Sequence, residues 1–152
     1  MVEFITESAT QTRQSTKEII KKLASQLSKR QGALVLALQG ELGSGKTTFV
    51  QGLAKELNLK EKVLSPTFVI MKRFATGDPR WANLYHLDCY RIGNAKDLDF
   101  FNFKEILADK NNLVVIEWAE RVKDILPKDA VWIKFEHGGE DKRRIKILNF
   151  KT

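Results

Sequence analysis

The sequence predicts an α/β sandwich: a mainly parallel central sheet with helices on both faces and a C-terminal antiparallel hairpin. Three observations predict this class. The segments 33–38 and 113–116 are short and entirely apolar, as strands buried on both faces are. Segments with helical periodicity alternate with strand-like segments along the chain. The last 23 residues alternate apolar and polar side chains on two arms, which is typical of a hairpin.

Helices are predicted where apolar residues recur at intervals of three and four. Residues 14–29 and 47–57 have this spacing, the former with lysines between its apolar positions. Residues 96–108 are expected to form a third helix, although three phenylalanines blur its ends. Residues 119–125 are expected to form a short helix that ends before Pro127.

Two further strands are predicted at 67–74 and 82–88, because their composition favours strands and residues 76–79, T-G-D-P, favour a turn between them. The C-terminal hairpin is expected to turn at Gly138-Gly139. The alternating apolar-face positions of its two arms are Val131, Ile133, Phe135, Ile145, Ile147 and Asn149.

Composition limits the class of protein. A chain of 152 residues with 43% hydrophobic side chains has the size and core of one domain, which we assign to residues 1–152. Its longest apolar run, 33–38, is far shorter than the roughly 20 residues of a membrane-spanning helix. Glu3 and Glu7 flank the N-terminal apolar residues, which argues against a signal peptide. The single cysteine excludes an internal disulfide, and we expect a cytoplasmic protein that binds no membrane.

The net charge of +7 is concentrated at the two ends of the chain. Residues 1–31 contain six Lys or Arg and three Asp or Glu, and residues 134–152 contain the same numbers. Such an excess can attract RNA or an acidic protein surface. Solvated faces of ordinary elements explain it equally well.

Residues 40–47 match the phosphate-loop pattern G-x-x-x-x-G-K-[ST] in full, after an apolar strand and before an amphipathic helix. The glycines allow main-chain N–H groups to turn toward phosphate oxygens, and the helix start adds a positive dipole. The lysine reaches the β- and γ-phosphates, and the threonine hydroxyl is a Mg²⁺ ligand. We therefore expect a P-loop NTPase-like sandwich that binds a nucleoside triphosphate and Mg²⁺. The candidate nucleotide-binding residues here are Gly40, Glu41, Leu42, Gly43, Ser44, Gly45, Lys46, Thr47 and Thr48.

A phosphate loop needs an acid at the end of a neighbouring strand to complete the Mg²⁺ site. Glu117 directly follows the apolar strand 113–116, and Asp88 ends the more amphipathic strand 82–88. The acid on the more buried strand is the better magnesium partner, directly or through water. The other acid is then available to orient or deprotonate the attacking water.

Other polar residues have weaker signals. Thr67, in Ser65-Pro66-Thr67, lies where phosphate-loop hydrolases have a switch threonine, but is also an ordinary residue of a turn before a strand. Arg91 has either a phosphate or an acid as its partner. His86 alternates with apolar residues and is interpreted as packed rather than catalytic. Cys89 has no adjacent base and is not expected to be a nucleophile.

The motifs together resemble the bacterial TsaE (YjeE) family over roughly residues 8–148. They are the phosphate loop, S-P-T-F at 65–68, H-L-D-C-Y-R at 86–91 and E-W at 117–118. The resemblance implies an ATPase subunit for the threonylcarbamoyl (t6A) modification of the adenosine beside the anticodon of tRNAs. It also implies TsaB-like and TsaD-like partners, with the modifying chemistry on the TsaD subunit and tRNA reached through the complex.

The resemblance also implies individual roles. Thr47 and Glu117 hold Mg²⁺, Asp88 is the water-activating acid, Lys46 is a further catalytic residue, and Thr67 belongs to the first switch. Tyr90 and Arg91 belong to the second switch, and Thr12 is the candidate contact to the adenine. The differences from the family pattern, Glu41 for Asp, Ser44 for Ala and Cys89 for an aliphatic residue, remove no required functional group.

Two alternative functions use the same loop. A small-molecule kinase transfers phosphate to an acceptor other than water, but such enzymes usually carry an arginine-rich lid, and only Arg121 lies between Glu117 and the hairpin. A nucleotide-gated tRNA-binding module would use the basic ends, including the run Lys142-Arg143-Arg144.

Overall fold

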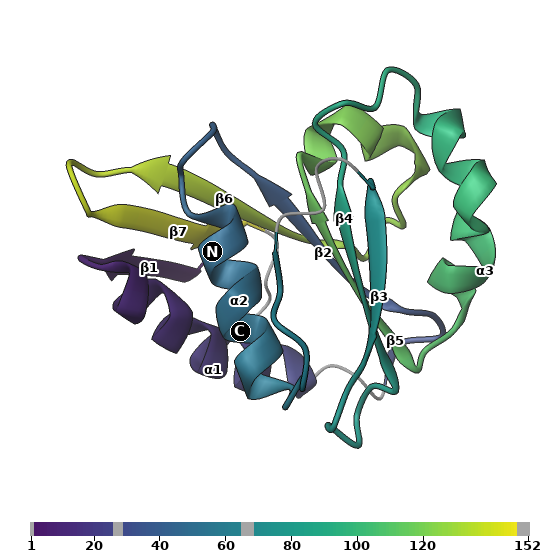
Figure 1. Cartoon of the computed structure of the whole chain (residues 1–152), viewed down its shortest axis with the longest axis horizontal. Coiled ribbons are helices and arrows are strands. Elements are labelled where there is room, and N and C mark those ends of the chain that lie inside the picture. Colours follow the sequence, from purple (N-terminus) through teal and green to yellow (C-terminus); the bar gives the residue numbers. More distant parts are fainter. Residues whose placement is uncertain (1, 26–28, 65–68, 149–152) are drawn as a thin grey trace.

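The computed structural model describes residues 2–25, 29–64 and 69–148, and these form a seven-stranded sheet with the order β1-β7-β6-β2-β5-β4-β3 (Figure 1). The strands are β1 (Val2–Thr6), β2 (Leu34–Gln39), β3 (Met71–Ala75), β4 (Asn83–Asp88), β5 (Asn112–Glu117), β6 (Val131–His137) and β7 (Arg143–Ile147). The helical elements are α1 (Ala9–Ala24), α2 (Lys46–Glu56), α3 (Phe103–Ala108) and the 3₁₀ segments η2 (Ala95–Phe101) and η3 (Ala119–Ile125).

The centre of the sheet is parallel, as the sequence predicts. β2 pairs in parallel with β5 on one side and β6 on the other, and β5 pairs in parallel with β4. Both faces of β2 and β5 are buried, which explains their uninterrupted apolar composition. Antiparallel strands lie at both edges of the described sheet, so the sheet as a whole is mixed.

The N-terminal strand β1 is an element that the sequence analysis missed. It pairs antiparallel with β7 and extends the C-terminal hairpin to three strands. Its five residues alternate in burial and include Glu3 between Val2 and Phe4, so they lack the apolar run that predicts a strand. The predicted hairpin itself is confirmed, with β6 and β7 on either side of Gly138-Gly139; Asn149 lies outside the described residues.

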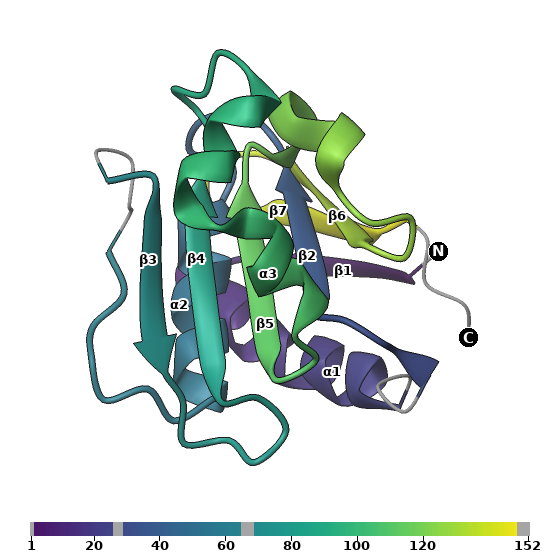
Figure 2. The same cartoon turned by 90° about the vertical axis from the view of Figure 1, so that its right-hand side faces the viewer.

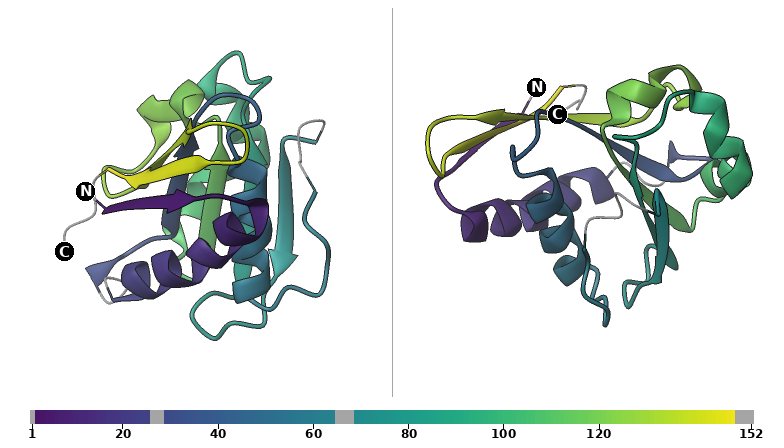
Figure 3. Two further views of the ribbon diagram at one scale, coloured as in Figure 1. Left: turned by 90° about the vertical axis from the view of Figure 1, so that its left-hand side faces the viewer. Right: turned by 45° about the horizontal axis from the view of Figure 1, so that its top comes forward.

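Helices cover both faces of the sheet, as predicted. α1 and α2 lie on one face, and η2, α3 and η3 on the other (Figures 2 and 3). Each face has its own apolar core. The first contains Leu36, Phe49 and Phe135, and the second contains Val35, Leu87 and Phe103. Within the described residues no helix is both long and apolar enough to cross a membrane.

The first helix begins earlier than predicted, at Ala9 rather than residue 14. The hydroxyl of Ser8 accepts the main-chain N–H of Gln11 and so caps the helix. The first turns carry polar side chains, of which Thr12 and Ser15 are buried, and apolar periodicity does not detect them. The helix ends at Ala24, and Leu27, which was expected to be part of it, lies outside the described residues.

The predicted helix at 96–108 is two elements. The 3₁₀ segment η2 and the α-helix α3 meet at Asn102, whose φ of 55° is in the left-handed region and breaks the helix. The helix at 47–57 is confirmed within one residue at each end. The predicted strand 67–74 is shorter at its start: residues 65–68 lie outside the described chain, and β3 begins at Met71.

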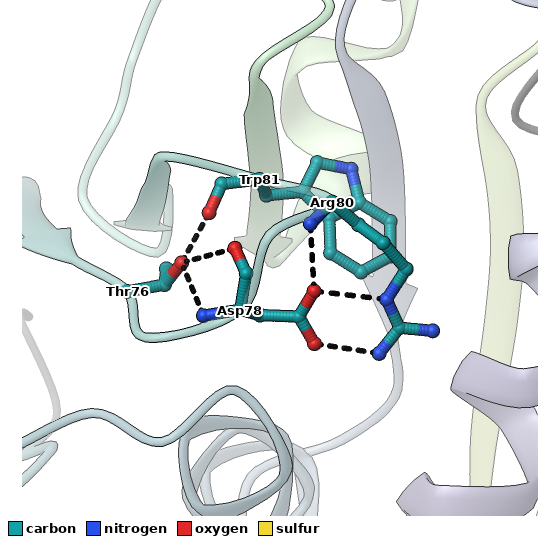
Figure 4. Close-up of polar contacts among 4 residues, drawn as sticks. All are labelled: Thr76, Asp78, Arg80 and Trp81. Carbon is teal, nitrogen blue, oxygen red and sulfur yellow. Dashed lines mark hydrogen bonds and ion pairs between the residues drawn. The ribbon is translucent and has the colours of Figure 1, made fainter.

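The turn between β3 and β4 contains a bidentate ion pair (Figure 4). The Arg80 guanidinium donates through Nε to Asp78 Oδ1 at 2.9 Å and through Nη2 to Asp78 Oδ2 at 2.7 Å. The Thr76 hydroxyl donates to the carbonyl of Trp81, which closes the turn. These contacts position the ring of Trp81 in the core beneath the turn.

Replacing Asp78 with Asn is expected to lower the free energy of unfolding by about 1–2 kcal/mol, because Arg80 loses a charged, largely buried partner. The hydrogen bond from Arg80 is the main cause of a lowered pKa of the Asp78 carboxyl. The stabilisation is therefore present above the unfolded-state pKa and disappears as the pH falls through the folded-state value. Urea unfolding at pH 7 and below about pH 4 checks this. A difference from wild type that grows on acidification contradicts it, and the exposed Asp99→Asn serves as control.

Candidate functional site

The predicted site residues meet at the carboxyl ends of the parallel strands. β2 leads directly into the phosphate loop, and the register pairs Leu38 with Glu117 and Glu117 with Asp88 (Figure 2). Ligands of α/β sheets bind at this edge. A pocket of about 350 Å³ lies here. It is lined by Ala9, Thr12, Leu42, Gly43, Ser44, Gly45, Lys46, Thr47, Thr48, Asp88, Tyr90, Glu117, Trp118, Asp141 and Arg143.

The loop turns through main-chain conformations that favour glycine. Gly43 has a φ of 77° and Gly45 a φ of 103°, so a side chain at either position is strained. Gly45 is the N-cap of α2 and provides no side-chain cap, unlike Ser8 at α1. The first N–H groups of α2 thus have no side-chain acceptor at the cap and face the pocket with the positive end of the helix dipole.

Lys46 begins α2 and is almost completely buried. Its Nζ donates to the carbonyl of Gly40 and, at 3.4 Å, to that of Glu41, and lies 3.8 Å from the ring centroid of Trp118. Burial is the main cause of its lowered pKa, which the charge of Glu117 partly offsets. The ammonium group therefore lies across the loop, between its first carbonyls and the ring of Trp118.

Glu117 connects the loop to the neighbouring strands. The Thr47 hydroxyl donates to Oε1 at 2.8 Å, and His86 Nε2 lies 2.6 Å from Oε2. The three residues come from α2, β5 and β4, and the side chains of Glu117 and His86 are 4% and 0% exposed. His86, interpreted from the sequence as packed, is buried as expected. It is also a partner of the predicted magnesium acid, which alternation along a strand does not reveal.

Asp88 lies beside Glu117 at the end of β4 and is buried. Its Oδ1 accepts the main-chain N–H of Tyr90 at 3.0 Å, which turns the chain away from the strand. The rings of Tyr90 and Trp118 are 5.0 Å apart and form an aromatic wall, and Trp118 adopts a φ of 58° immediately after β5. Strained main chain of this kind is concentrated at functional sites.

The opposite wall comes from the two ends of the chain. Ala9 and Thr12 of α1 line it, and the Thr12 hydroxyl is 2.7 Å from that of Thr6 in β1. Arg143 lines it from β7, with its side-chain stem 3.7 Å from the position that a Cβ of Gly45 would occupy. The sequence leaves either a phosphate or an acid as the partner of Arg91; in the structure Arg91 is exposed and does not line this pocket.

Other predicted residues lie apart from this cavity. Gly40 and Glu41 line the opposite side of the loop, against β6. Gly40 is required there because a Cβ would lie 2.7 Å from the carbonyl oxygen of Phe135. Thr67 falls in the stretch 65–68 outside the described residues, so its predicted switch role stays a prediction. No group of three or more His, Cys, Asp or Glu able to hold a metal occurs among the described residues.

Known proteins resemble this chain in sequence and in fold. Residues 10–145 match the sequence model of a family described as threonylcarbamoyl adenosine biosynthesis protein TsaE. The chain belongs to the TsaE family. Family membership agrees with the motif set, which sequence analysis found along the same stretch of chain. The chain is therefore a protein of tRNA threonylcarbamoyladenosine biosynthesis.

Individual TsaE relatives match most of the chain. The TsaE protein of Aquifex aeolicus is 32% identical over 148 residues, which is 96% of this chain and 98% of the relative. That of Bacillus subtilis is 36% identical over 112 residues, 73% of this chain and 66% of the relative. The crystal structure of Bacillus subtilis YdiB superposes with a TM-score of 0.66 at 30% identity, covering 95% of this chain and 82% of that one.

Cys89 follows Asp88 in the chain but is not expected to react. Burial raises the pKa of its thiol to about 12, with Asp88 and Glu120 adding to the shift. A thiol reagent such as DTNB at pH 8 should therefore leave the native protein unmodified, while urea-unfolded protein reacts with one equivalent. Rapid stoichiometric labelling of the folded chain would show that the thiol is accessible and ionised.

Proposed function

We propose that residues 1–152 form one P-loop ATPase domain, which binds MgATP and hydrolyses it as a subunit of the threonylcarbamoyladenosine assembly. The observation that carries the proposal is the contact between Thr47 and Glu117. It places the hydroxyl that follows the phosphate-loop lysine against a buried carboxylate of the adjacent strand, 2.8 Å apart. A glycine-rich turn without a ligand does not require this pairing.

The side chains present fit a magnesium ion. Mg²⁺ prefers oxygen ligands and is usually held by one or two carboxylates together with substrate phosphates. Thr47 and Glu117 provide a hydroxyl and a carboxylate at the mouth of the loop. When bound, the metal supplies charge that neutralises the β- and γ-phosphate oxygens. We assign Thr47 and Glu117 to hold it, Glu117 directly or through water.

The remaining residues divide the work of phosphate binding and water activation. The main-chain N–H groups of residues 43–48 and the ammonium group of Lys46 bind the phosphate oxygens. Thr12 lines the opposite wall of the pocket and is the candidate contact to the adenine. Asp88 orients a water molecule and accepts its proton as the water oxygen attacks the γ-phosphorus. The bond from that phosphorus to the bridging oxygen breaks, which yields ADP and phosphate.

The assembly partners are proposed from family membership. We infer that TsaB-like and TsaD-like proteins bind this chain, and that tRNA is reached through them. The charge pairs of the hairpin favour this over direct tRNA binding: Arg144 Nε lies 2.9 Å from Glu3, and Lys142 Nζ lies 3.9 Å from Glu7. These acids pair with two of the three basic residues of the run Lys142-Arg143-Arg144, which the RNA-binding alternative includes.

The Lys46→Ala variant should bind MgATP about 10- to 100-fold more weakly and lose hydrolysis, because a charge-assisted hydrogen bond to phosphate is lost. Isothermal titration calorimetry measures the affinity and release of phosphate measures turnover. Lys55→Ala, on the exposed face of the same helix, is the matched control. An unchanged affinity and rate in Lys46→Ala would contradict the assignment of the loop as the phosphate-binding site.

The Asp88→Asn variant should keep its affinity for MgATP while turnover falls about 100-fold or more, because the amide keeps the acceptor for Tyr90 but is no base. Single-turnover hydrolysis separates the chemical step from binding. Equal loss of both affinity and turnover would make Asp88 a binding residue instead. The exposed Asp99→Asn controls for a change in net charge.

The partner and reaction classes can be tested together. We expect purified TsaD-like and TsaB-like proteins from the same organism to form a complex with this chain that depends on MgATP, as detected by size-exclusion chromatography. The γ-phosphate should be released as inorganic phosphate rather than transferred to an added small-molecule acceptor, which distinguishes an ATPase from a kinase. Binding of tRNA by the isolated chain would favour the RNA-binding alternative.

A further inference from the structure

His86 lies on the same face of the sheet as the two acids. β4 and β5 pair in parallel, with His86 opposite Val115 and Asp88 opposite Glu117. Alternate residues of a strand face the same side, so His86 and Asp88 share the face on which Val115 and Glu117 lie. Val115 packs in the core beneath α1 and α2. His86 is therefore located between the apolar core and the mouth of the loop.

The hydrogen bonds of Glu117 fix both of its carboxylate oxygens. Oε1 accepts from the Thr47 hydroxyl at 2.8 Å, and Oε2 lies 2.6 Å from His86 Nε2. The 2.6 Å separation is short, as expected for a hydrogen bond to a charged acceptor. With one donor on each oxygen, the carboxylate plane is held in a single orientation.

The environment of the other ring nitrogen of His86, Nδ1, indicates the role of this side chain. Nδ1 is buried and has no hydrogen-bond partner among the described residues. A carboxylate only accepts hydrogen bonds, so the proton between the two side chains belongs to Nε2. A buried polar atom without a partner is destabilising, and a phenylalanine would fill the same space without it. Packing alone therefore does not explain a histidine here, whereas the bond to Glu117 does.

We propose that His86 is a positioning residue for the magnesium site, which acts by orienting Glu117 and touches neither nucleotide nor metal. The inference rests on the proposed function, since it assigns a supporting residue to the acid that holds Mg²⁺. Outer residues that orient a metal-binding carboxylate typically change metal affinity or activity by about 10- to 100-fold when replaced. Glu117 without its second donor can rotate away from Thr47.

The test compares three variants whose side chains differ in where they place a donor. His86→Phe fills the site without a donor. His86→Gln has an amide nitrogen as many bonds from Cβ as Nε2 is, so it can reach Glu117. His86→Asn has its amide nitrogen at the Nδ1 position and cannot. Thermal unfolding identifies the variants that fold. If His86→Phe does not fold, the comparison of His86→Gln with His86→Asn is the test.

Calorimetry measures ATP affinity in EDTA and in excess Mg²⁺. The affinity in excess Mg²⁺ divided by the affinity in EDTA gives the contribution of the metal. We expect His86→Phe and His86→Asn to lower this ratio about tenfold or more while the affinity in EDTA changes less than about twofold, and His86→Gln to restore most of the ratio. A role in packing alone would instead change stability or both affinities together.

The outcomes separate this inference from the proposed function. Wild-type protein whose ATP affinity does not respond to Mg²⁺ contradicts the proposed function and this inference with it. A magnesium response that persists in His86→Phe, or a Gln variant no better than Asn, contradicts this inference alone. ¹⁵N NMR of the metal-free protein gives a readout independent of nucleotide: Nε2 of His86 should carry a proton, and a ring without one there overturns the proposal.

Discussion

The hydrogen bond between Thr47 and Glu117 is the contact on which the rest of the site depends. It joins residues seventy positions apart in sequence, and both are placed by the parallel pairing of β2 with β5. A slip of one residue in that register would turn Glu117 to the opposite face, because side chains alternate along a strand. The apolar residues before Glu117 pack alternately into the two cores, and a slip would exchange side chains of different size in both. The two cores therefore fix the site as well as the fold.

Charge reinforces this arrangement at the edge of the core. A buried carboxylate is unfavourable unless it is hydrogen-bonded or paired, and Glu117 has donors on both oxygens. Lys46 is buried nearby, and the attraction of Glu117, Glu120 and Asp88 opposes the lowering of its pKa by burial. Trp118 contributes the face of its ring to the same ammonium group. The ammonium group of Lys46 thus lies where phosphate oxygens can compete with the loop carbonyls for it.

Local sequence patterns predict the phosphate loop, the helix that follows it and the two acids of the site. The phosphate loop combines glycine spacing, a preceding apolar strand and a following helix, and the structure places those elements within one residue of the prediction at α2. Glu117 and Asp88 were predictable because each ends a strand, and parallel strands end at the same edge. By contrast, β1 contains too few apolar residues, and Asn102 breaks a helix through its own backbone conformation rather than through any loss of periodicity.

The residues that escaped prediction at the site depend on contacts between distant segments. Arg143 reaches the loop because β7 follows β6 outward from β2, an order that no short stretch of sequence specifies. His86 was assigned to the core from its alternation with apolar neighbours, and that assignment is correct as far as burial goes. Its partner depends on the register of β4 against β5, which puts a core-facing position diagonal to Glu117. Alternate residues of a strand share a face, so a polar residue two positions before the end of β4 faces the same side as the acid that ends it. The alternation that indicates a core therefore also identifies His86 as a residue able to support Glu117 on the neighbouring strand.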